Sequence, residues 1–101
     1  KRVAALAKEG TVWKVAMDGT AWSNTFDMAW EPVFSPDSAK VAVRVEKDGK
    51  YTIALDDQLW SHACDAIWDP VFSPDSQKIL LKSIEAGTYY RRVIPVNELI
   101  R

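Results

Sequence analysis

The chain has 101 residues, 48% of them apolar, with 13 basic against 14 acidic residues, which suffices for one buried core and carries no signature of nucleic-acid binding. Cys64 is the only cysteine and His62 the only histidine, so an internal disulfide, a structural zinc site, an iron–sulfur cluster and a covalent haem attachment are excluded, and we expect no cofactor. No apolar run approaches the roughly 20 residues that cross a bilayer, which predicts no direct membrane insertion.

Three β-hairpins are predicted in chain order, at residues 3–17, 40–55 and 79–96. In each, two runs that alternate apolar and polar side chains flank a turn containing glycine. Short strands ending in Val33-Phe34 and Val71-Phe72 precede the second and third hairpins. A helical pattern is almost absent, and only the last few residues, from Val96 on, are predicted to form a short helix.

The chain is a tandem repeat, because residues 30–38 return as 68–76. A period near forty with about four strands per unit is typical of propeller blades. The fold class we predict is all-β, with tandem four-stranded antiparallel blades of a β-propeller. Residues 1–29 supply three strands of one blade, 30–67 a complete blade, and 68–101 three strands of another with a C-terminal tail.

About two and two-thirds blades cannot close a ring, which needs about four to eight. The end blades therefore leave open strand edges. Either copies of the chain associate through these edges as a homo-oligomer, or the chain is a segment of a longer propeller. Because it starts at Lys1-Arg2 and not at Met, we interpret it as a piece of a longer polypeptide.

A Ser-Pro-Asp-Ser turn occurs in each repeat. Proline fixes φ at the second position of such a turn, and the aspartate bonds to the local backbone. One short carboxylate per turn lacks the ligand count of a calcium site, so we expect structural roles for these residues. They are Pro36, Asp37, Pro74 and Asp75. Asp27 and Asp65, each three residues before a tryptophan, are likewise expected to accept backbone N–H bonds.

The segments Val33-Phe34-Ser35-Pro36-Asp37-Ser38 and Val71-Phe72-Ser73-Pro74-Asp75-Ser76 resemble the WD-like propeller repeat of the TolB type, whose mark is an aromatic residue followed by Ser-Pro-Asp-Gly. The likeness covers the whole chain. The family commonly has glycine where this chain has Ser38 and Ser76. From this departure we expect that the turn does not require a positive φ at that position.

A closer likeness lies in the tryptophan-bearing segments. Trp22-Ser23, Trp30-Glu31-Pro32, their copies from Trp60 onward and the ending 89–96 resemble the TmcD family, the tryptophan-rich D subunits of the Tmc transmembrane redox complexes of sulfate-reducing bacteria. This resemblance implies a cytoplasmic accessory subunit, peripheral to the inner membrane. It also implies haem-bearing and iron–sulfur partners and no redox centre in this subunit itself.

Four tryptophans recur at equivalent positions, namely Trp22, Trp30, Trp60 and Trp68. The favoured interpretation is packing between blades, because each ring buries roughly 150–250 Å². The alternatives are stacking platforms for a sugar, a ligand or a partner surface, and a minor role in electron relay.

The segment Tyr90-Arg91-Arg92 departs from its copy, Thr52-Ile53-Ala54. Two adjacent arginines project to opposite faces of a strand, so one must leave the core or pair with an acid. We expect a partner contact here before anywhere else, against a default of a solvated edge strand. Cys64 and His62 lack an orienting acid, so we interpret Cys64 as a space-filling residue and not as a nucleophile.

These observations predict a non-catalytic protein-interaction module, an accessory subunit or fragment of a membrane-attached electron-transfer complex. Its expected partners are proteins, including redox-complex subunits, and not nucleic acids. One alternative is a small-ligand or sugar binder that uses the repeated tryptophans. The other is a gating domain of a larger enzyme.

Overall fold

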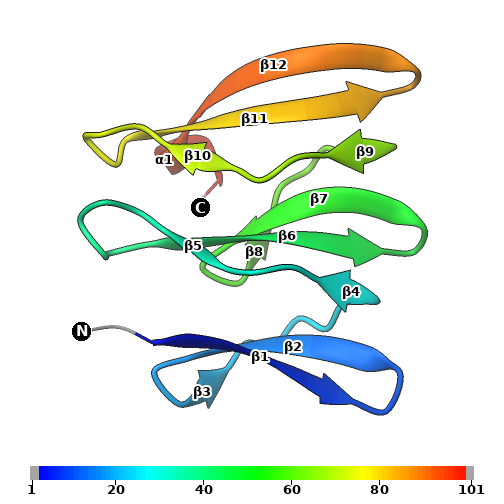
Figure 1. Cartoon of the computed structure of the whole chain (residues 1–101), viewed down its shortest axis with the longest axis vertical. Helices are drawn as coiled ribbons and strands as arrows, with labels where there is room; N and C mark the ends of the chain where they lie inside the picture. Colours follow the sequence, from blue (N-terminus) through cyan, green and yellow to red (C-terminus); the bar gives the residue numbers. More distant parts are fainter. Residues whose placement is uncertain (1–2, 100–101) are drawn as a thin grey trace.

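The computed structural model describes residues 3–99 and arranges their strands in three antiparallel sheets, stacked along the longest axis of the molecule (Figure 1). The first sheet contains β1 (Ala4–Glu9), β2 (Val12–Met17) and β3 (Thr20–Ala21). The second contains β4 (Met28–Ala29), β5 (Val33–Phe34), β6 (Val41–Lys47), β7 (Lys50–Leu55) and β8 (Gln58–Leu59). The third contains β9 (Ala66–Ile67), β10 (Val71–Phe72), β11 (Lys78–Glu85) and β12 (Thr88–Pro95), followed by α1 (Val96–Leu99).

The all-β fold class and the three predicted hairpins are confirmed, and no sheet closes on itself within residues 3–99. The predicted terminal helix forms as α1, and the rest of that prediction, residues 100–101, lies outside the described residues. No helix between residues 3 and 99 is long and apolar enough to cross a membrane.

Strand pairing reveals the same unit in the second and third sheets. β4 and β5 pair with opposite ends of β6, so together they act as one edge strand that is interrupted around Pro32. β9 and β10 pair with β11 in the same way. Because β4 and β9 pair within the following sheet, the boundaries between sheets fall slightly earlier than 30 and 68.

Left-handed backbone at the turns corrects one expectation from the sequence. Asp48 and Gly49 both have positive φ, 54° and 79°, as a two-residue hairpin loop with matching twist requires. Ser38 and Ser76 also have positive φ, 61° and 62°, so the expectation that this turn needs no positive φ is wrong. The Ser38 N–H donates to the Ser35 carbonyl oxygen at 2.8 Å, and closing the turn in this way places a non-glycine residue in the left-handed region.

Two apolar layers lie between the three sheets. The first layer joins Val15, Trp22 and Phe26 to Val41, Val43 and Val45 of the second sheet. The second layer joins Ile53, Leu55 and Cys64 to Ile67, Ile79 and Leu81 of the third sheet. Alternate residues of a strand point to opposite faces, so the side chains of β6 pack against both the first and the third sheets. The second sheet is therefore covered on both faces, whereas the first and third sheets each have one face that no other sheet within residues 3–99 covers.

Candidate functional site

Trp22 and Trp60 point into the layers between sheets. Trp22 is 8% exposed and packs between the first and second sheets. Trp60 is half-buried and packs against the layer between the second and third sheets. Both residues follow a short edge strand, and both donate a backbone hydrogen bond to the neighbouring long strand. Their positions support a packing role.

Trp30 and Trp68 occupy equivalent positions but differ in their surroundings. Trp30 is half-buried, with the Arg44 guanidinium 4.6 Å above its ring and the Tyr51 ring at 5.9 Å. Trp68 is 44% exposed and packs edge-on against Tyr89 at 6.0 Å. The difference arises because the third sheet covers the face that bears Trp30, while no sheet within residues 3–99 covers the face that bears Trp68.

The outer face of the third sheet is a mixed apolar and basic surface. Ile79 and Leu81 point into the layer beside the second sheet, so Leu80, which lies between them, points away from that sheet. Val93 pairs with Leu80 across the hairpin and points the same way. Together with their neighbours on that side they form the outer face: Trp68, Val71, Leu80, Lys82, Tyr89, Arg91 and Val93. A shallow hollow of about 400 Å³ lies over part of it, between Val71, Leu80, Arg91 and Val93.

This outer face repeats the face by which the second sheet packs on the third. At the equivalent positions the second sheet has Val33, Tyr51 and Leu55, all in or against the apolar layer. Arg91, however, replaces Ile53, which is fully buried. Within residues 3–99 neither Lys82 nor Arg91 forms an ion pair. The face therefore combines apolar area with two cations.

Arg92 points the other way, into the layer between the second and third sheets. Its Nε and Nη2 atoms both donate to the Glu85 carboxylate at 2.7 Å, and Ser83 Oγ donates to Glu85 Oε2 at 2.6 Å. The Arg92 guanidinium holds the pKa of Glu85 at about 2, although burial opposes the shift. His62 Nδ1 lies 3.6 Å from the same carboxylate, so an acid does lie beside His62, contrary to the expectation from the sequence.

The structure therefore separates the three residues that the sequence grouped. Arg92 stacks over the Tyr90 ring at 4.5 Å, and both lie on the side of β12 that faces the second sheet. Arg91 alone points outward. The sequence required one of the two arginines to leave the core or to pair with an acid, and Arg92, on the inner side of β12, pairs with Glu85.

The Ser-Pro-Asp-Ser turns carry closely similar hydrogen bonds. Asp37 Oδ1 accepts from Ser35 Oγ at 2.6 Å and from the Ala39 N–H at 2.9 Å, and these bonds, the first above all, lower the pKa of Asp37. Asp75 makes the matching bonds with Ser73 Oγ and the Gln77 N–H. Pro36 and Pro74 precede the two aspartates on the exposed side of each turn.

Asp27 and Asp65 link each sheet to its own hairpin turn. Asp27 accepts from the Asp48 N–H at 2.8 Å, and Asp65 accepts from the Gly87 N–H at 3.2 Å. Asp65 also pairs with the Lys50 ammonium at 2.8 Å, which joins the second sheet to the start of the third.

A clamp between the first two sheets was not foreseen from the sequence. Asp57, in the turn between β7 and β8, accepts from Ser23 N–H (2.9 Å), Ser23 Oγ (2.8 Å), Asn24 N–H (3.2 Å) and Asn24 Nδ2 (2.9 Å). Burial alone would raise the pKa of Asp57, but these hydrogen bonds lower it on balance. The carboxylate thereby fastens the second sheet to the outer edge of the first.

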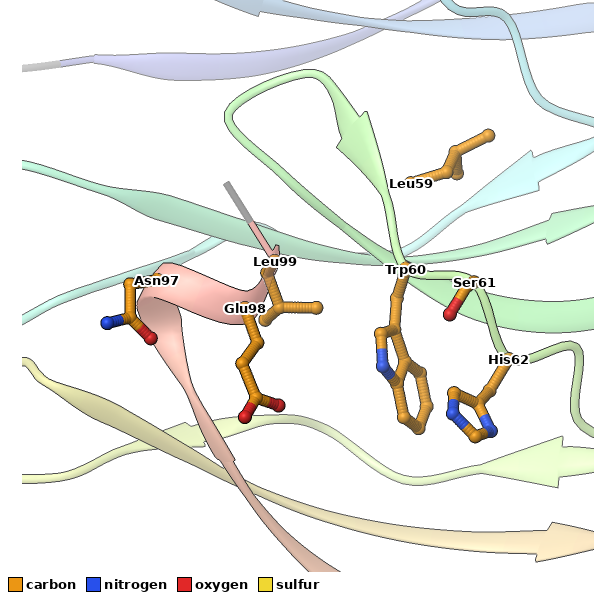
Figure 2. Close-up of a pocket in the computed structure, with 7 residues that line it drawn as sticks. All are labelled: Leu59, Trp60, Ser61, His62, Asn97, Glu98 and Leu99. Atoms are coloured by element: carbon orange, nitrogen blue, oxygen red, sulfur yellow. The ribbon is translucent and has the colours of Figure 1, made fainter. Parts of the chain in front are cut away.

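A hollow of about 390 Å³ opens between the loop after β8 and α1 (Figure 2). The Trp60 and His62 rings stack at 4.5 Å and form one wall, and α1 forms the other. The lining residues are Leu59, Trp60, Ser61, His62, Asn97, Glu98 and Leu99.

Residues 3–99 contain no group of three or more histidine, cysteine or acidic side chains placed to hold a metal ion. The Cys64 thiol is fully buried, and burial raises its pKa, so the thiolate that nucleophilic chemistry needs is disfavoured. What the arrangement offers chemically is surface contact and hydrogen bonding. No family model, curated protein or solved structure matches this chain.

Proposed function

We propose that this chain is a non-catalytic protein-interaction module, an accessory subunit or fragment of a membrane-attached electron-transfer complex. Its contact surface is the outer face of the third sheet. The observation that carries the proposal is that this face repeats a packed inter-sheet face yet is solvent-exposed, with Val93 63% exposed where Leu55 is fully buried. Exposed apolar area of this kind marks interaction sites.

On the equivalent face of the second sheet, a cation binds the neighbouring third sheet. Arg44 donates from Nη1 to the Ile67 carbonyl oxygen at 3.0 Å and lies 3.6 Å from the Asp69 carboxylate, both at the start of the third sheet. Lys82 occupies the equivalent position on the outer face. The partner we propose is therefore a protein surface that is apolar at its centre and offers carboxylate and carbonyl oxygens to Lys82 and Arg91.

An antiparallel unit recurs in the second and third sheets, in which two short strands form one edge beside a long hairpin, and this supports the view that the sheets are propeller blades. The packing of one sheet on the next supports a stack that a partner continues. The electron-transfer setting rests on the resemblance of the tryptophan-bearing segments to the D subunits of Tmc complexes. In that setting the chain lies at the cytoplasmic side of the inner membrane beside subunits that carry the redox groups.

Site-specific photo-crosslinking tests the proposal, in a sulfate-reducing bacterium that carries a Tmc complex. A photo-reactive residue replaces Val93 on the outer face of the third sheet, and the matched control replaces Val3, which is 61% exposed just before β1. We expect Val93 to yield a crosslink to a haem-bearing or iron–sulfur subunit, and Arg91→Glu to abolish it. Equal products from both positions, no product from Val93, or stoichiometric haem or iron in the purified chain would each refute the proposal.

A further inference from the structure

The loop that Asp57 clamps in the first sheet has a copy in the second sheet. Trp22 and Trp60 donate to Val15 and Ile53 at 2.7 and 2.9 Å, and Phe26 and Cys64 form matching bridges to the neighbouring strand. The two loops therefore share one backbone arrangement. Ser61 stands where Ser23 stands, and His62 stands where Asn24 stands.

The two copies differ in what faces the loop. In the first copy, the β7–β8 turn supplies the Asp57 carboxylate. In the second, β12 runs on through Pro95, the repeat equivalent of Asp57, and continues into α1. Within residues 3–99 no carboxylate accepts from the Ser61 N–H, from Ser61 Oγ or from the His62 N–H. The hollow of about 390 Å³ opens at this point (Figure 2).

We infer that the Ser61–His62 loop is a receptor for a carboxylate supplied from outside residues 3–99, either a small free carboxylate or an acidic side chain of a partner. Three donors that hold Asp57 in the first copy have counterparts here: the two backbone N–H groups and the serine hydroxyl. Hydrogen bonds to an ionised acceptor are about twice as strong as neutral ones. This site is independent of the outer face of the third sheet.

The surroundings of the loop set how strongly it binds. The fourth donor of the first copy, Asn24 Nδ2, is lost, because the His62 ring stacks on Trp60 and its Nδ1 faces Glu85. The Glu85 charge is compensated by Arg92. Glu98 of α1 borders the hollow and brings a like charge (Figure 2). Free carboxylates therefore bind weakly, and removal of the Glu98 charge strengthens binding.

The test is an NMR titration of the nitrogen-15-labelled chain with acetate and, separately, with a blocked Gly-Asp-Gly peptide, with chloride at matched ionic strength as the blank. We expect saturable shifts of the Ser61 and His62 amides with both ligands. Ser61→Ala lowers the affinity about tenfold, the effect of one hydrogen bond to a charge. Glu98→Gln raises it about threefold through the lost repulsion. Tighter binding of the peptide than of acetate identifies an acidic side chain as the natural ligand, and equal binding identifies a free carboxylate.

Asp57→Gly provides the matched control, since glycine suits the φ of 68° at this position. This variant uncovers the Ser23–Asn24 loop, so acetate should now shift the Ser23 and Asn24 amides as well. If Asp57→Gly responds at Ser23 while the unmodified chain shows no change at Ser61, the loop after β8 is not a receptor. An absence of response at both loops overturns the inference equally, because the shared donor geometry then fails to hold a detached carboxylate.

Discussion

Glu85→Gln should destabilise the fold by about 2 kcal/mol at neutral pH. Arg92 and Ser83 hold the pKa of Glu85 at about 2, against 4.5 for an ordinary glutamate. Each unit of such a difference corresponds to about 1.36 kcal/mol, which gives an upper bound of about 3 kcal/mol. Because the Arg92 side chain is 31% exposed, solvent screening reduces the expected loss to about 2 kcal/mol.

The pH dependence of the stability loss shows whether the ion pair between Glu85 and Arg92 causes it. The pKa of Glu85 is lower in the folded than in the unfolded state, so its contribution is complete above the unfolded value of 4.5 and is lost as the pH falls towards about 2. Asp37, Asp57, Asp65 and Asp75 also have lowered pKa values and weaken the fold over an overlapping acid range. The difference in stability between the unmodified chain and Glu85→Gln removes this shared background.

Urea unfolding followed by tryptophan fluorescence, at steps from pH 7 to pH 3, measures this difference. We expect it to shrink steadily below about pH 5. Glu31→Gln is the matched control, because Glu31 is exposed, and it should leave stability within about 0.5 kcal/mol. A Glu85→Gln loss that stays constant across the pH range would refute the assignment of the loss to the ion pair.

Two further substitutions test the turns. Ser38→Gly should stabilise the fold by about 0.5–1 kcal/mol, because Ser38 holds a φ of 61° that glycine adopts without strain, and thermal unfolding would show this as a raised Tm. Asp57→Asn should destabilise the fold by about 1–2 kcal/mol, because it weakens the hydrogen bonds to Ser23 and Asn24. The control Asp48→Asn, at another left-handed turn position, should change stability little. Equal effects of the two substitutions in urea unfolding would contradict the role of Asp57 as a clamp.

The hairpins were predictable because their signals are local. Alternation in residues 41–47 and the Asp48-Gly49 pair specify two strands and their turn without reference to the rest of the molecule. The different exposure of Trp30 and Trp68 was not predictable in this way. A repeat makes the two residues equal, and only the presence or absence of a covering sheet makes one half-buried and the other 44% exposed.

The groups that link the sheets were missed for a related reason. Asp57 has Gly19 and Pro95 at its repeat positions, and Glu85 has Lys47 and Glu9 at its own, so neither is a residue that recurs in all three hairpins. An arginine in the core was expected to pair with an acid, but the sequence did not identify Glu85 as that acid. The sequence signal that marks Asp57 and Arg91 is a charge that breaks the repeat, whereas Glu85 breaks it only against Lys47.

Arg91 also influences which partner the outer face binds. If a second copy continued the stack with its first sheet, the small apolar residues Ala5 and Ala7 on that sheet's outer side would meet Arg91, and the carboxylate on the same side, Glu9, already pairs with Lys14 at 3.4 Å. A guanidinium buried against such a surface loses its hydration without gaining a partner, which costs several kcal/mol. A surface that carries a carboxylate avoids this cost and gains a charged hydrogen bond. Arg91 thus favours an acidic, non-identical partner over indefinite stacking of the repeat, because its desolvation destabilises a contact with the first sheet of another copy.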